Sequence, residues 1–125
     1  MTDNILTVDL YETAQVKLDG SGNGTAFISP VGPRNGGLRW EITACAVKAS
    51  SNVLEAAGEC FVSYGLRSTD AGSSKGQTAT GSSGDTCGLA VTIRPNDYVS
   101  VKWTGGDVGA IATMVLTGTI YPPGT

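Results

Sequence analysis

The clearest structural signal in the chain lies at residues 13–29, which read Thr13-Ala-Gln-Val-Lys-Leu-Asp-Gly-Ser-Gly-Asn-Gly-Thr-Ala-Phe-Ile-Ser29. In the first half, apolar and polar residues alternate, which places Ala, Val and Leu on one face of a β-strand. The glycine-rich centre, Gly20–Gly24, tolerates the positive φ angles that tight turns need, and Thr25–Ser29 returns as a second strand. The pattern predicts a β-hairpin.

Strand patterns continue on both sides of this segment. A central strand is expected at residues 38–49, with one apolar phase formed by Leu38, Trp40, Ile42, Ala44 and Ala46. Pro95-Asn-Asp97 separates two later strands and predicts a second hairpin. The other strands are expected at residues 5–11, 60–65, 87–94, 98–104 and 110–121.

The number and spacing of these strands indicate the fold class. About seven or eight short strands, with turn signals at intervals of roughly ten residues, are typical of an antiparallel β-sandwich. The connections are too short for a parallel α/β sheet. We therefore expect one all-β domain over residues 1–125, a jelly-roll or immunoglobulin-like variant without significant helix. Its expected core contains Val16, Leu18, Trp40, Ile42, Leu89, Val91, Val101, Trp103, Met114 and Leu116.

Composition argues against several classes of function. The 125 residues include no histidine, so the commonest general base and metal ligand are missing. Eight scattered Lys and Arg residues and a net charge of −3 give no basic patch, so we expect no nucleic-acid partner. No long apolar run and no secretory signal pattern occur, so we expect synthesis in the cytosol and no membrane association.

Three cysteines, Cys45, Cys60 and Cys87, lie in strand-like segments without a C-x-x-C pair. Their spacing does not match a zinc site, and their odd number is unlike a disulfide scaffold. We interpret them as small buried hydrophobic residues. A Cys60–Cys87 bridge between strands that flank a long loop is the alternative.

Two patterns resemble binding or catalytic sites but are incomplete. Asp19-Gly-Ser-Gly-Asn-Gly24 begins like a calcium loop, but Pro30 stands where the bidentate glutamate is expected, so we interpret it as a plain turn. The eleven carboxylates show no sign of a catalytic pair, and no nucleophile or phosphate-binding motif occurs. We predict no catalytic residue, no cofactor, no metal and no enzyme activity.

Aromatic residues allow two interpretations. They form either part of the core or a face on which a sugar stacks, and the candidates are Tyr11, Trp40, Tyr64, Tyr98, Trp103 and Tyr121. Both tryptophans fall in the apolar phase of their strands, which favours core packing for them.

Residues 68–86 contain four Gly, five Ser and four Thr and no large apolar side chain. Burial of these side chains cannot offset the entropy lost when they are ordered. Loops of this length in compact domains are usually functional or disordered. We expect this loop and the N-terminal arm, residues 1–6, to lie on a neighbouring subunit.

Turn motifs at residues 18–34 and 101–113, together with Trp40, form a distinctive pattern. These are a Gly-Asn-Gly-Thr-Ala hairpin, a Gly-Pro-Arg turn, Trp40 at the start of the next strand, and a late Trp-Thr-Gly-Gly turn before an Ala-rich last strand. With this set the chain resembles small virion proteins of tailed bacteriophages that infect actinobacteria. The resemblance spans residues 16–119 and leaves out the 68–86 loop and the cysteines.

The resemblance implies a non-enzymatic virion protein, made in the host cytoplasm, that decorates the capsid surface as a homo-oligomer, a trimer or a dimer. Its partners would be the major capsid protein or other virion subunits. The expected contacts lie in the N-terminal arm, residues 30–37 and the 68–86 loop: Ile5, Leu6, Pro30, Pro33, Arg34, Ser73, Ser74 and Lys75. The alternatives are a carbohydrate- or receptor-binding tail component and a small hydrolase.

Overall fold

The computed structural model describes residues 7–30, 38–50, 53–54, 56–64, 74–78 and 86–122. These residues form eight strands: β1 (Val8–Lys17), β2 (Gly24–Ile28), β3 (Arg39–Ala49), β4 (Ala57–Ser63), β5 (Ser74–Thr78), β6 (Thr86–Ile93), β7 (Tyr98–Thr104) and β8 (Ile111–Tyr121). The described part of the chain contains no helix that could cross a membrane. The predicted all-β class is confirmed.

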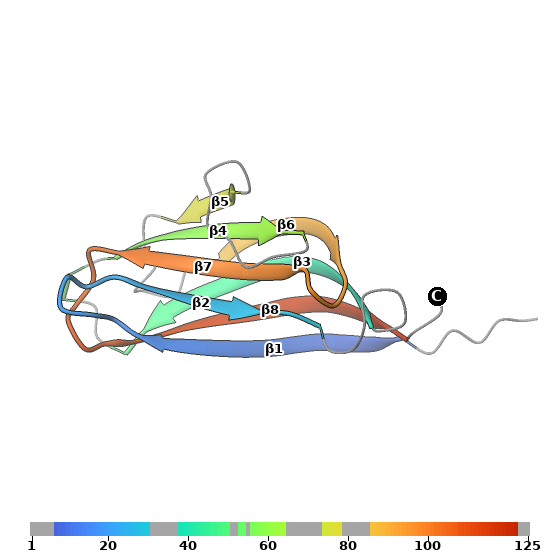
Figure 1. The fold of residues 1–125 in the computed structure, drawn as a ribbon, viewed down its shortest axis with the longest axis horizontal. Coiled ribbons are helices and arrows are strands. Elements are labelled where there is room, and N and C mark those ends of the chain that lie inside the picture. The colour runs from blue at the N-terminus through green and yellow to red at the C-terminus, as the bar shows by residue number, and fades with distance from the viewer. Residues whose placement is uncertain are drawn as a thin grey trace, which may run out of the picture.

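The strands form two antiparallel sheets that pack face to face (Figure 1). The first sheet has the order β1-β8-β3-β6 and the second has the order β2-β7-β4-β5. Between β4 and β5 the chain stays in one sheet, whereas each of the other connections crosses to the opposite sheet. This strand order is that of a jelly roll, in which two Greek keys form a sandwich. The expected sandwich is therefore present in its jelly-roll variant.

Both predicted hairpins are wrong in the pairing of their strands. β1 pairs with β8, and β2 pairs with β7, although the two flank the same glycine-rich turn. β6 and β7 are divided between the sheets in the same way. At their turn Asn96 has a φ of 74°, and the Asp97 N–H donates to the Arg94 carbonyl at 2.8 Å. Turn residues reverse the chain, but they do not determine whether the returning strand pairs with the outgoing one or crosses to the other sheet.

The 68–86 segment, which we expect to be a loop, contains the edge strand β5. This strand pairs with β4, from Gly58 opposite Thr78 to Phe61 opposite Ser74. Pairing uses backbone groups alone, so an edge strand does not need apolar side chains. The sequence Ser-Lys-Gly-Gln-Thr therefore forms a strand without showing the alternation by which the others are recognised.

β3 is the interior strand that the sequence predicts, with β8 and β6 as its neighbours. Its inward phase changes half-way, because a bulge between Ile42 and Ala44 shifts the register. Cys45 and Val47 are consequently buried, whereas Ala44 and Ala46, which we expect inside, are half-exposed. A bulge adds one residue and leaves both halves of the strand alternating, so the sequence pattern does not show it.

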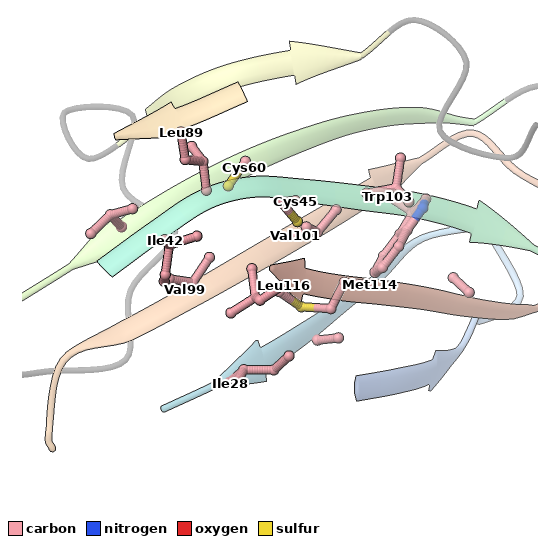
Figure 2. Close-up of a cluster of buried hydrophobic side chains, with 14 of the residues drawn as sticks. Ile28, Ile42, Cys45, Cys60, Leu89, Val99, Val101, Trp103, Met114 and Leu116 are labelled. Carbon is pink, nitrogen blue, oxygen red and sulfur yellow. The ribbon is translucent and has the colours of Figure 1, made fainter. Parts of the chain in front are cut away.

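The core fills the space between the sheets (Figure 2). Most of the predicted core residues are buried: Leu18, Trp40, Ile42, Leu89, Val101, Trp103, Met114 and Leu116. Val16 and Val91 are partly buried against them. Removal of this apolar surface from water is the main force that holds the two sheets together.

Candidate functional site

The predicted subunit contacts fall in different parts of the chain. Pro30 is buried at the end of the segment that follows β2. Ser74 and Lys75 belong to the edge strand β5. The other predicted contacts lie outside the described residues: Ile5, Leu6, Pro33, Arg34 and Ser73. The outer faces of the two sheets are the better-defined candidate surfaces.

The outer face of the second sheet is partly closed by aromatic side chains. Phe27 and Tyr98 pack edge to face, with ring centroids 6.2 Å apart. Phe61 lies on the same side of the sheet, since both it and Phe27 are opposite Ser100 in the ladder, and it is only 2% exposed. Ser63 and Ser100 on this side are buried as well. This half of the second sheet therefore offers little free surface.

The outer face of the first sheet is open, and its uncharged centre lies between charged ends, with Asp9 and Glu41 beside Thr119 and Lys48 beside Thr113. Its central strand β8 contributes Thr113, Val115, Thr117 and Thr119. Tyr11 of β1 is opposite Thr117, and Ala46 of β3 is opposite Val115, so three strands share one surface. The Tyr11 side chain is 68% exposed. Short and β-branched side chains make this face flat.

Shallow depressions mark the same face. One of about 390 Å³ is lined by Tyr11, Ala46, Val47, Lys48, Val115 and Thr117. Another of about 290 Å³ lies beside Gln15 and Ile111, where the Gln15 amide donates to the Thr113 hydroxyl at 3.3 Å. An exposed aromatic ring beside an apolar floor provides a large contact area for a partner.

The sequence-based prediction named Tyr11 as a candidate for sugar stacking but missed the surface around it, although one signal for that surface was present. Tyr11 falls among the polar residues of its strand, and an aromatic residue in the solvent-facing phase is a candidate for contact. Ala46 could not be found in this way, because only the bulge in β3 turns it outward.

Tyr121, at the end of β8, is held by two neighbours. The Arg39 guanidinium carbon lies 4.2 Å from the centre of the tyrosine ring. Nη2 of the same arginine lies 3.9 Å from Glu41 Oε2. A hydrogen bond with Glu41 and the negative charge of that carboxylate raise the pKa of Tyr121. The ring is therefore already engaged by neighbouring side chains.

The structure separates the aromatic residues that were candidates for sugar stacking. Trp40 and Trp103 are buried in the core. Tyr11 and Tyr64 are exposed, but Tyr11 lies in the first sheet and Tyr64 follows β4 of the second. The exposed tyrosines thus do not form one stacking face, and Tyr11 lies beside a depression of the first sheet.

Asp107 anchors an exposed aliphatic tip at one end of the sandwich. Its carboxylate oxygens accept the N–H groups of Val53 at 2.8 Å and Leu54 at 3.1 Å. Val53 is 88% exposed. Leu54, which also donates to this carboxylate, and Val108, which follows Asp107 in the sequence, are exposed as well. The loop before β4 and the loop before β8 are thereby tied together.

The calcium-like motif forms a turn whose carboxylate binds its own backbone. Asp19 Oδ1 accepts the N–H groups of Ser21 at 2.8 Å and Asn23 at 3.0 Å. These two hydrogen bonds, with Asn23 the stronger influence, lower the pKa of Asp19 below its ordinary value of 3.8. The described residues contain no group of three His, Cys, Asp or Glu side chains that could hold a metal ion.

The cysteines of β3 and β4 both lie inside the sandwich. Cys45 and Cys60 are 0% and 3% exposed and belong to opposite sheets (Figure 2). A hydrogen bond with the Cys45 side chain, together with burial, raises the pKa of Cys60 far above its ordinary range. Cys87 is partly buried and lies opposite Cys45 in the β3–β6 ladder. None of the three is in a disulfide bond, so the alternative Cys60–Cys87 bridge is not formed.

Comparison with known proteins gives little similarity. No family model matches the chain, and no curated protein is similar to it in sequence. Among solved structures, a family two carbohydrate esterase from Cellvibrio japonicus resembles it with 11% identity and a TM-score of 0.31. The superposition covers 93% of this chain and 36% of the esterase chain. Similarity at this level says nothing about activity.

Proposed function

We propose that this protein is a non-enzymatic structural component of a tailed-bacteriophage virion, where it decorates the capsid surface. In this proposal the outer face of the first sheet contacts the shell. The observation that carries the proposal is the flat, open surface formed by β1, β8 and β3, whose central residues Tyr11, Val115 and Thr117 are uncharged. The resemblance of residues 18–34 and 101–113 to small virion proteins supports the choice of partner.

A flat sheet face suits a protein surface better than a small ligand. Small-molecule sites are concave and enclose most of the ligand, whereas the depressions around Tyr11 and Gln15 are shallow. The short side chains of Ala46, Val115 and Thr117 allow close approach of a partner, and interface centres are poor in charge. Each bound copy would add buried area across a seam between shell subunits and so stabilise the assembled shell.

The use of the turn carboxylates supports a structural role. Asp19 and Asp107 each accept two backbone N–H groups, and Asp97 Oδ2 accepts the Arg94 N–H at 3.0 Å. A carboxylate engaged in this way stabilises a turn. Each of these three residues lies in a turn between two strands.

A pair of matched variants tests the proposed contact face. Thr117→Arg places a long charged side chain in the depression beside Tyr11, whereas Thr104→Arg makes the same change at an exposed site on β7 of the second sheet. We expect Thr117→Arg to weaken co-sedimentation with protein-depleted shells at least about tenfold, the effect of about 1.4 kcal/mol. Thr104→Arg should bind like the wild type. Equal binding of both variants would overturn the assignment of this face.

The second candidate function is a receptor- or carbohydrate-binding component of the tail. The exposed Tyr11 ring beside its depression favours this alternative, since sugars stack on exposed aromatic rings. In that case Tyr11→Ala should abolish retention on host cell-wall material. Both the wild type and the variant should bind shells poorly. Retention equal to that of the wild type would rule the alternative out.

A further inference from the structure

We propose that Cys45 and Cys60 form a disulfide bond between the two sheets when the protein folds in the presence of a disulfide oxidant. The bond would join β3 of the first sheet to β4 of the second, two strands that share no backbone hydrogen bonds. It would therefore add a covalent link where side-chain packing alone holds the sandwich together.

The geometry of the two thiols carries this inference. Cys45 of β3 and Cys60 of β4 lie on opposing sheets in the same buried cluster (Figure 2), and the side chain of Cys45 is the main influence on the Cys60 thiol. A disulfide requires β-carbons that face each other and a sulfur–sulfur bond of about 2.05 Å. Two buried thiols that interact from facing strands of the two sheets are suited to this requirement. Both are buried among the same core residues, so the bond would be shielded from reductants.

Cys87 is the competing partner, because it lies directly opposite Cys45 in the β3–β6 ladder. Side chains of directly opposed ladder residues project side by side instead of toward each other, which is less suited to a disulfide. The Cys87 thiol also lies 3.7 Å from the Gly88 carbonyl oxygen. A Cys45–Cys87 bond would link two strands that are already hydrogen-bonded, and it would leave the sheets unlinked.

The chemistry requires an oxidant such as oxidised glutathione. One cysteine thiolate attacks a glutathione sulfur, which forms a mixed disulfide and releases one glutathione thiolate. The second cysteine thiolate then attacks the protein-bound sulfur and releases the second glutathione. Two protein thiols are oxidised, one glutathione disulfide is reduced to two thiols, and the two protons pass to glutathione.

The exchange belongs to folding and not to the finished native state. The interaction with the Cys45 side chain, together with burial, raises the pKa of Cys60, so the folded protein contains little of the reactive thiolate. Before the sheets dock, both thiols are exposed and ordinary in reactivity. The redox conditions during folding therefore determine whether the bond is present.

Oxidative refolding followed by peptide mapping tests the proposal. The full chain is denatured and reduced, then refolded either with reduced and oxidised glutathione or with a reductant alone, and alkylated in denaturant. Trypsin separates the cysteines into peptides 40–48, 49–67 and 76–102. We expect three alkylated cysteines after reductive refolding and one, Cys87, after oxidative refolding, with peptide 40–48 linked to 49–67. The oxidised protein should melt on the order of 10 °C higher.

Two variants control for other pairings. Cys87→Ala should keep both the 40–48 to 49–67 link and the rise in melting temperature, whereas Cys60→Ala should lose both. A link from peptide 76–102 to either other peptide would overturn the proposal, and so would three alkylated cysteines after oxidative refolding. The map of the wild-type chain decides this even where a variant folds poorly.

Discussion

Gly118 occupies a very close backbone contact in the first sheet. It lies opposite Ile42, next to the bulge in β3, and a Cβ at this position would overlap the carbonyl oxygen of Glu41. A side chain here must push β8 and β3 apart. We predict that Gly118→Ala lowers the free energy of unfolding by about 2–3 kcal/mol, the scale of an overpacked interior site, as measured by urea denaturation.

Gly88→Ala is the matched control for this change. Gly88 also lies in the first sheet, but a Cβ there would meet no atom within 4 Å. The stability of the Gly88→Ala variant should be unchanged or slightly raised, because alanine restricts the unfolded chain more than glycine does. Equal losses in the two variants would contradict the close contact at Gly118.

Asp19 links a single charge to the acid stability of the protein. Because its pKa is lowered in the folded state by hydrogen bonds from Asn23 and Ser21, the unfolded chain takes up the proton at higher pH. The stability that this carboxylate contributes is present above its unfolded pKa and is lost as the pH falls through the folded pKa. Wild-type protein should therefore lose stability below about pH 4.

Asp19→Asn tests this dependence, because the amide keeps an acceptor oxygen but does not titrate. We predict a smaller fall in melting temperature for the variant than for the wild type between about pH 5 and about pH 2. Thermal melts followed by circular dichroism measure the difference. Parallel curves for the two proteins would show that the Asp19 turn does not contribute to acid sensitivity.

The loops at the Asp107 end of the sandwich act as one unit. Besides the carboxylate contacts to Val53 and Leu54, the Gly106 N–H donates to the Gly22 carbonyl at 2.9 Å. The loops before β2, β4 and β8 are thus connected by short polar contacts in addition to the packing of their buried residues Leu18, Ala56 and Ala110. We predict that Asp107→Ala speeds hydrogen exchange at Val53 and Leu54 and lowers stability by about 1–2 kcal/mol.

Asp107→Asn provides the control for this prediction. Its amide oxygen can still accept one of the two N–H groups. Exchange at that amide should therefore be slower than in Asp107→Ala, and stability should lie between that of the wild type and that of the alanine variant. Unchanged exchange at both amides in Asp107→Ala would show that the carboxylate does not hold this tip.

Individual strands were predictable from sequence where one face is buried. The alternation of Ala14, Val16 and Leu18 identified β1, because an inward phase needs apolar residues. β5 was missed for the opposite reason, since an edge strand pairs through its backbone and Ser74–Thr78 contains no apolar residue. The bulge that turns Cys45 inward is likewise invisible in a local pattern.

For the molecule as a whole, sequence indicated the sandwich but not its connectivity. Which sheet a strand joins depends on contacts between distant residues, such as the pairing of β1 with β8, and local turn chemistry carries no information about them. The candidate contact face follows from this same connectivity. Tyr11, Ala46 and Thr117 form one surface only because β1, β8 and β3 are neighbours in the first sheet.

The jelly-roll sandwich also explains how one face can be free for a partner while the core stays closed. The second sheet buries Phe61 on its outer side, whereas the first sheet exposes Tyr11 on its own. A shell subunit that packs on the first sheet would cover this surface without disturbing the interior. The proposed role thus depends on the location of the protein on a virion.

Immunogold electron microscopy of purified phage particles, with an antibody against this protein, tests that location most directly. Our account predicts gold particles spread over the surface of the head. Gold confined to the tail would contradict capsid decoration in favour of the receptor-binding alternative, and intact particles without gold would contradict a virion role altogether.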